Sequence, residues 1–167
     1  PALSRILLEQ GNVARVSITA ALGAIGSVSA IEALKRLYEG TKGHAQRIAI
    51  WAMGLSNTPE ALTALSEIST SRQPQDRILA AWALGARADR RAIPTLNKLA
   101  KSGDGRQRIA ALWALGQSPF AEITGSCATS LRSKDPLERQ LASQALSRIG
   151  TEAAQRLLIQ ELWRADE

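Results

Sequence analysis

Three tryptophan residues give the most specific chemical signal in this chain of 167 residues. Trp51, Trp82 and Trp113 follow one another at intervals of 31 residues, and each begins a Trp-Ala-Leu-Gly string, with Met53 replacing leucine in the first. An indole combines a large apolar surface with one N–H donor, and tryptophan is enriched at the energetic centres of protein interfaces. Tryptophan at this regular spacing predicts a surface that binds a partner molecule.

The residues that catalysis would need are scarce. The chain has one histidine, His44, and one cysteine, Cys127. They belong to different repeats, so we do not expect them to form a nucleophile–base pair. The sequence contains no cluster of His and Cys and no acidic loop with the spacing of a metal site. We therefore predict no catalytic residue, no metal and no cofactor, and a protein that is not an enzyme.

A column of arginines runs beside the tryptophans. Arg15, Arg77, Arg108 and Arg139 each stand near the start of an Ala- and Leu-rich segment, and Arg47 lies one residue off the equivalent position. One interpretation is a ladder of positive charge for phosphate groups. The other is one arginine per repeat that bridges adjacent repeats, and this is the role we expect.

The elements that position these residues are predicted to be helices. Five Ala- and Leu-rich segments end at residues 23, 54, 85, 116 and 147, and none is interrupted by Pro or an internal Gly. After each comes a turn and a second stripe of apolar residues at spacings of three and four, such as Leu62, Leu65 and Ile68. Pro59 and Pro119 stand where second helices would begin. A fixed period of about 31 residues with two helices per unit is typical of a helical solenoid.

This pattern resembles the HEAT repeat, in particular the bacterial HEAT-like type associated with phycobilisome lyases. The residues that carry the resemblance are Ala20–Gly26 and Arg91–Leu96, and the pattern extends over nearly the whole chain. It implies an all-α, right-handed α-solenoid of about five HEAT-like helix hairpins, in a single domain over 1–167. The repeats are predicted at 12–43, 44–75, 76–105, 106–137 and 138–167. Residues 1–11 are predicted to be the second helix of a truncated preceding repeat, which would make the chain a segment of a longer protein.

The resemblance places the tryptophan column on a concave face lined by the first helix of each hairpin. A contiguous apolar patch rimmed by polar groups marks an interaction site. The predicted partner-binding residues are Trp51, Trp82, Trp113, Arg47, Ile78, Ile109, Arg106, Gln117, Gln144 and Arg148. The alternative is that each indole packs between repeats and fills the space left by the many alanines.

We predict a non-enzymatic scaffold that binds a peptide, helix or protein surface along the concave face through this Trp/Ile stripe. The net charge of +6 favours an acidic partner. One alternative is a nucleic-acid-binding HEAT-like scaffold. Another, implied by the resemblance alone, is a bilin lyase or chromophore chaperone subunit. The sequence has no apolar stretch long enough to span a membrane, and its single cysteine fits a reducing, cytoplasmic compartment.

Overall fold

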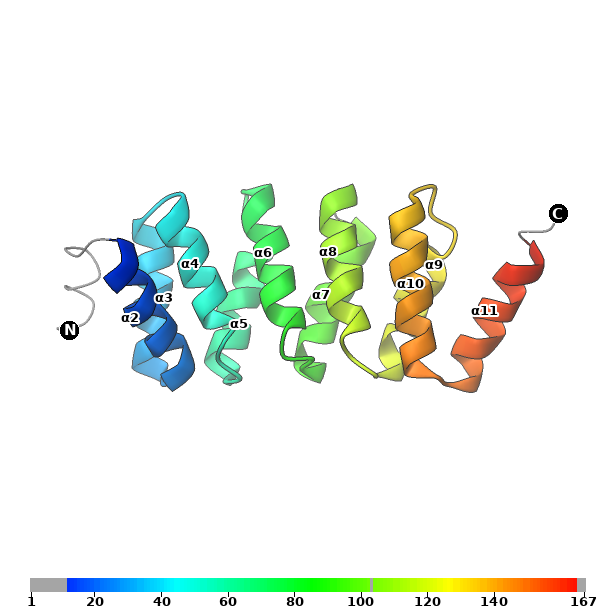
Figure 1. Cartoon of the computed structure of the whole chain (residues 1–167), viewed down its shortest axis with the longest axis horizontal. Helices are drawn as coiled ribbons and strands as arrows, with labels where there is room; N and C mark the ends of the chain where they lie inside the picture. The colour runs from blue at the N-terminus through cyan, green and yellow to red at the C-terminus, as the bar shows by residue number, and fades with distance from the viewer. Residues whose placement is uncertain (1–11, 103, 165–167) are drawn as a thin grey trace. The chain divides into compact units, whose positions relative to one another are not determined.

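The computed structural model describes residues 12–102 and 104–164 (Figure 1). Its α-helices are α2 (Asn12–Ile25), α3 (Val28–Gly40), α4 (His44–Met53), α5 (Pro59–Ile68), α6 (Pro74–Gly85), α7 (Ile93–Ser102), α8 (Gly105–Gly116), α9 (Thr124–Ser130), α10 (Pro136–Ile149) and α11 (Glu152–Arg164). Short 3-10 helices, Arg90–Ala92 and Ala121–Ile123, precede α7 and α9. The described part contains no strand, so the predicted all-α class is confirmed. The helix predicted within 1–11 lies outside the described residues.

The helices pack in two compact units, one ending at Arg87 and the other beginning at Ala88. In the first unit, α2 contacts α4 and α4 contacts α6, while α3 and α5 form a second layer behind them (Figure 1). In the second unit, α8 packs against α10, and α7, α9 and α11 belong to the other layer. We call α2, α4, α6, α8 and α10 the first helices and the others the second helices. No helix in the described part has the length and apolarity that crossing a bilayer would require.

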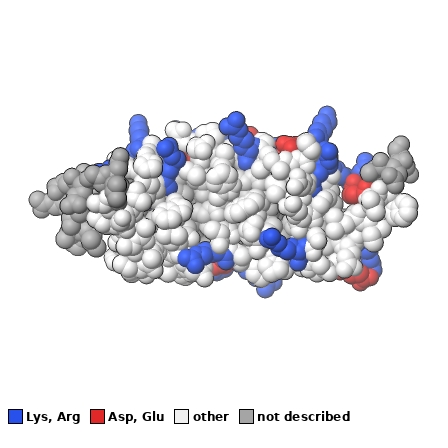
Figure 2. Space-filling model, viewed as in Figure 1, with Lys and Arg blue, Asp and Glu red and all other residues white. Residues whose placement is uncertain are grey.

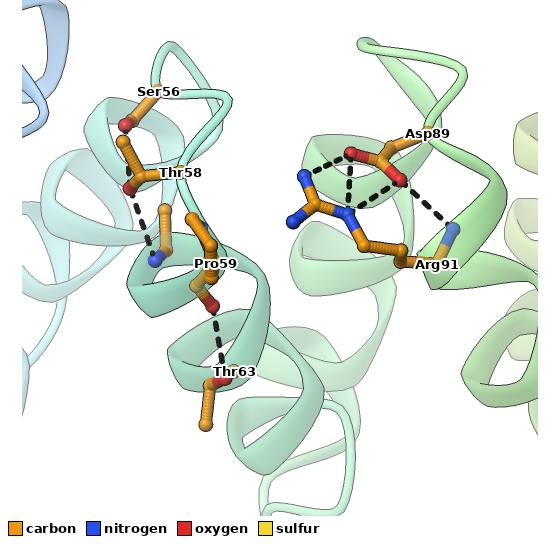
Figure 3. Close-up of polar contacts among 7 residues, drawn as sticks. Ser56, Thr58, Pro59, Thr63, Asp89 and Arg91 are labelled. Atoms are coloured by element: carbon orange, nitrogen blue, oxygen red, sulfur yellow. Dashed lines mark hydrogen bonds and ion pairs between the residues drawn. The ribbon is translucent and has the colours of Figure 1, made fainter.

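Local capping chemistry sets where several helices begin. The Thr58 hydroxyl accepts a hydrogen bond from the Ala61 amide at 3.4 Å, and Pro59 opens α5 as predicted (Figure 3). Asp89 caps the 3-10 helix before α7 by accepting from the Arg91 amide at 2.8 Å. The Arg91 guanidinium also donates to this carboxylate, and those hydrogen bonds hold the pKa of Asp89 below its usual range.

Proline positions correct the predicted element boundaries. Pro74 and Pro136 are the first residues of α6 and α10, so these helices begin ahead of the predicted repeat starts at 76 and 138. Proline suits the first helical position because its missing N–H would have no partner there anyway. Pro119 was predicted to open a second helix, but the chain after it is extended at Phe120 and turns helical only at Ala121.

Three closing glycines of the repeat strings, Gly23, Gly54 and Gly116, lie against the next first helix. A Cβ on Gly23 would stand 2.1 Å from the Ala52 carbonyl oxygen, and one on Gly54 would stand 2.8 Å from the Ala83 Cβ. In the second unit, a Cβ on Gly116 would meet the Ala145 Cβ at 3.5 Å. The Ala-Leu-Gly string is therefore a contact motif, in which small residues let the helices approach and leucine fills the core.

Candidate functional site

The three tryptophans occupy equivalent positions on α4, α6 and α8 and reach solvent. Trp51 is 52% exposed, Trp82 48% and Trp113 38%. No indole N–H of the three donates a hydrogen bond to another described residue. About half of each side chain is therefore available for contact, and the alternative in which the indoles are sealed between hairpins does not hold.

The first unit brings Trp51 and Trp82 together. They lie 31 residues apart on α4 and α6, which pack against each other, so they occupy neighbouring helices on one face. Packed helix axes are about 8–10 Å apart, which sets the approximate spacing of the two rings. Arg47 is exposed one turn before Trp51. Ile78, predicted to extend the stripe, is only 8% exposed, so it belongs to the core and offers a partner little surface.

The second unit gathers Trp113, Gln117 and Arg148. The Gln117 amide donates to the Trp113 carbonyl oxygen at 3.3 Å, and its own side-chain oxygen accepts from Arg148 at 3.2 Å. Arg148 also donates to the Gly116 carbonyl oxygen at 2.6 Å. Of the other predicted residues, Ile109 is half-buried and lies one turn before Trp113, while Arg106 and Gln144 are exposed.

The charges of the first helices are segregated. Their acidic residues are Asp76 and Glu138, buried at 4% and 3% exposure, and their basic residues are arginines apart from His44 at the start of α4. Within each unit, Figure 2 shows mostly uncharged surface over the middle of the helices and Lys and Arg side chains near their ends. The first-helix surface therefore carries indoles and arginines without an exposed carboxylate, an arrangement that attracts anionic groups.

The arginine column divides between two roles. Arg108 on α8 donates to the Glu138 carboxylate on α10 at 2.8 Å and so bridges adjacent repeats as expected. Arg139 instead donates to the Ser133 and Lys134 carbonyl oxygens of the loop before its own helix, which corrects its predicted bridging role.

Nucleophilic chemistry finds little support in the described residues. Cys127 lies on α9 with no exposed surface, and burial raises the pKa of its thiol to about 12. A thiol so protonated at neutral pH is a poor nucleophile. His44, at the start of α4, belongs to the other unit. Within 12–102 and 104–164, no three His, Cys, Asp or Glu side chains are grouped so that they could hold one metal ion.

Two features were missed by sequence reasoning. Arg87, just after α6, donates to the Gly54 carbonyl oxygen at 3.3 Å. The repeat pattern gives no signal for this contact, because Arg87 stands one position later in its repeat than Arg148 does in its own. The second feature is the outer face of α11, where Ile159, Leu162 and Trp163 are 55%, 65% and 69% exposed. It adjoins a cavity of about 520 Å³ between α9, α10 and α11. Helical spacing alone predicts burial of Leu162, so the sequence carries no signal for its exposure.

Comparison with known proteins identifies the repeat. Residues 65–122 match the family model for HEAT repeats, and residues 14–40 match the model for the PBS lyase HEAT-like repeat. This chain is a HEAT-repeat protein. The resemblance predicted from Ala20–Gly26 is thereby confirmed, since that string falls inside the second match.

Solved structures with the same fold accompany these matches. The HEAT-repeat chain is similar to a chain in the complex of CpcE and CpcF of phycocyanin lyase from Nostoc sp. PCC7120, with a TM-score of 0.67, 20% identity, and coverage of 94% of this chain and 68% of that one. It is also similar to an engineered protein, with a TM-score of 0.57, 22% identity, and coverage of 96% and 83%. At these identities the likeness establishes the fold alone. No curated protein sequence shows significant similarity.

Proposed function

We propose that this HEAT-repeat protein is a non-enzymatic scaffold that binds a partner protein on its first helices, with Trp51 and Trp82 as anchors in the first unit and Trp113 as the anchor in the second. One observation carries the proposal: the tryptophans are 38–52% exposed in helices whose other large apolar side chains are buried, such as Ile50, Leu84 and Leu112, or half-buried. A solvated indole contributes little to the core, whereas at an interface it buries a large area at small cost in conformational entropy.

The spacing of the indoles supports a helical partner. Residues seven apart on an α-helix are separated by about 10 Å along its axis. Packed first helices are about 8–10 Å apart, so side chains i and i+7 of a helix lying across α4 and α6 would each reach one indole. The absence of exposed carboxylates on the first helices favours a partner segment rich in Asp and Glu.

The test compares two tryptophan-to-alanine variants in the whole protein. Binders are first selected from a library of random 16-residue peptides displayed on phage. Trp82→Ala is expected to weaken selected peptides by about 30-fold or more, the loss that corresponds to a hot spot of about 2 kcal/mol. Because half of the ring is already in water, its free energy of unfolding should fall by less than the 3–5 kcal/mol typical of a buried tryptophan.

Trp163→Ala is the matched control, because Trp163 is 69% exposed on α11, outside the first helices. It should leave both peptide affinity and melting temperature unchanged. The proposal fails if Trp82→Ala and Trp163→Ala bind alike, or if the wild-type protein enriches no peptide.

The second candidate is a subunit of a bilin lyase or a chromophore chaperone. The PBS lyase HEAT-like match at 14–40 and the fold shared with the phycocyanin lyase complex support it. Its test is the absorbance spectrum after mixing with phycocyanobilin. A shifted band that Trp82→Ala abolishes would favour this candidate over a peptide-binding scaffold.

The third candidate function is a scaffold that binds nucleic acid, which the arginines of the first helices support. Binding of a duplex DNA oligonucleotide should then weaken steeply as salt rises, because each phosphate contact releases counterions. An indole-anchored peptide complex should respond much less.

A further inference from the structure

Arg87 is fixed beside the tryptophan of the preceding repeat. Its Nε donates to the Gly54 carbonyl oxygen at 3.3 Å, at the end of α4. The last carbonyls of a helix lack intrahelical donors and carry the negative end of the dipole, which explains why a guanidinium settles there. Gly54 follows Trp51 by three residues and so lies one turn further along the same face. The Arg87 charge is therefore held about one helical turn from a half-exposed indole.

The second unit contains the same arrangement independently. Arg148, just before the end of α10, donates through Nη1 to the Gly116 carbonyl oxygen at 2.6 Å, and Gly116 follows Trp113 by three residues. Gln117 strengthens this contact, since it accepts from the same Nη1 at 3.2 Å and donates to the Trp113 carbonyl oxygen. A tryptophan paired with a carbonyl-anchored arginine from the next repeat thus occurs in both units.

Neither guanidinium is neutralised by a carboxylate of the described residues. Arg90, Arg108 and Arg132 pair with Glu122, Glu138 and Glu161, but Arg87 and Arg148 contact only neutral oxygens. Both are exposed. A guanidinium has five N–H donors in a planar fork, so one or two neutral contacts orient it and leave donors for another group.

We infer that Arg87 and Arg148 are carboxylate-binding residues of the first-helix surface, each taking an Asp or Glu side chain of an acidic helical segment whose neighbouring apolar side chain packs on Trp51 or Trp113. This inference rests on the proposed function and specifies its partner. Carboxylate and guanidinium form paired, parallel hydrogen bonds, and an arginine already held in place loses less entropy on forming them. The first helices themselves offer no exposed acid that would compete for these guanidinium groups.

The experiment repeats the peptide selection with the whole protein carrying Arg87→Gln, Arg148→Gln, or both. Glutamine keeps hydrogen-bond donors but removes the charge and the fork. The wild-type protein should enrich peptides with Asp or Glu next to an apolar residue, and the double variant should lose this acidic preference. A selected peptide and its Glu→Gln counterpart should differ in affinity by at least about tenfold on the wild-type protein and much less on the variants.

The matched control is Arg36→Gln, an exposed arginine on α3 of the first unit, on the layer of second helices. It should retain the acidic preference, and melting curves check that all variants fold. The inference is overturned if the double variant discriminates Glu from Gln as well as the wild-type protein does. It is also overturned if a DNA oligonucleotide displaces the peptides and shows the same dependence on Arg87 and Arg148.

Failure of this inference is distinguishable from failure of the proposed function. If selected peptides depend on Trp82 but show no acidic preference, only the arginine role is lost. If no peptide depends on Trp82, the scaffold proposal is lost as well.

Discussion

Gly23 and Gly125 are both helical glycines, but their surroundings are opposite. A Cβ on Gly23 would stand 2.1 Å from the Ala52 carbonyl oxygen, a backbone atom that can move only if α4 moves. Around Gly125, on α9, a Cβ would meet nothing within 4 Å. The same substitution should therefore have effects of opposite sign at the two positions.

Gly23→Ala is expected to destabilise the protein by about 2 kcal/mol or more, through a forced shift of packed backbone. Gly125→Ala should stabilise it by about 0.5–1 kcal/mol, because alanine loses less backbone entropy in a helix. Urea denaturation of the two variants and the wild-type protein measures both differences. A gain in stability from Gly23→Ala would mean that α2 and α4 do not approach as closely as described.

At the residue scale, sequence reasoning located the tryptophans but could not fix their exposure. A 31-residue period places Trp51, Trp82 and Trp113 on equivalent positions, yet a ring on an alanine-rich helix can lie in a groove or between hairpins. Only the geometry of neighbouring helices distinguishes these cases. The same limit explains Ile78, which stands one turn from Trp82 but turns into the core.

Each first helix of the later repeats buries one polar side chain near its start. Asp76, Gln107 and Glu138 occupy equivalent positions and are 3–4% exposed. Each bonds the loop before its helix: Ser71 donates to Asp76, Gln107 to Asp104, and Ser133 to Glu138. Tyr38 on α3, two hairpins earlier, donates to Asp76, and Arg108 on α8, in the preceding hairpin, donates to Glu138. These buried side chains therefore connect helices of different hairpins.

Glu138→Ala should test this arrangement. It leaves Arg108 and the Ser133 hydroxyl without the carboxylate, and we expect a loss of about 2–3 kcal/mol in the free energy of unfolding. Glu67→Ala is the control, because Glu67 pairs with Lys35 between α5 and α3 but is 54% exposed, and exposed pairs contribute about 0–1 kcal/mol. Equal losses in the two variants would contradict a special role for the buried column.

At the element scale, local sequence signals predicted most of the helices but failed where tertiary packing determines the backbone conformation. Ala- and Leu-rich strings, four of them closed by Gly and the fifth by Ser147, identified the first helices α2, α4, α6, α8 and α10, because the pattern is repeated and strongly periodic. The helix start predicted at Pro119 was wrong, because a proline can precede a helix by several residues. The extended backbone of Phe120, which follows it, has no sequence signature. The fourth second helix, α9, spans only Thr124–Ser130, and its Gly, Ser and Thr residues are weaker helix formers than Ala or Leu.

At the scale of the whole molecule, cohesion is unevenly distributed along the chain. In a repeat protein each hairpin contacts only its neighbours, so stability is the sum of local terms. Within the second unit, α8 buries Ala110, Ala111, Leu112, Ala114 and Leu115, whereas α11 contributes Ala154 alone to the fully buried set. The helices of one unit should therefore open at different free energies.

Hydrogen exchange of the whole protein measures this difference directly. Amides of α11 should exchange at least about tenfold faster than those of α8, because opening α11 breaks contacts mainly with α9 and α10. Trp163→Ala should leave the exchange of both helices unchanged, since that side chain is mostly in water. If α11 were protected as strongly as α8, its exposed Ile159, Leu162 and Trp163 would have to be covered in solution, for example by association between copies, and the protection would then fall on dilution.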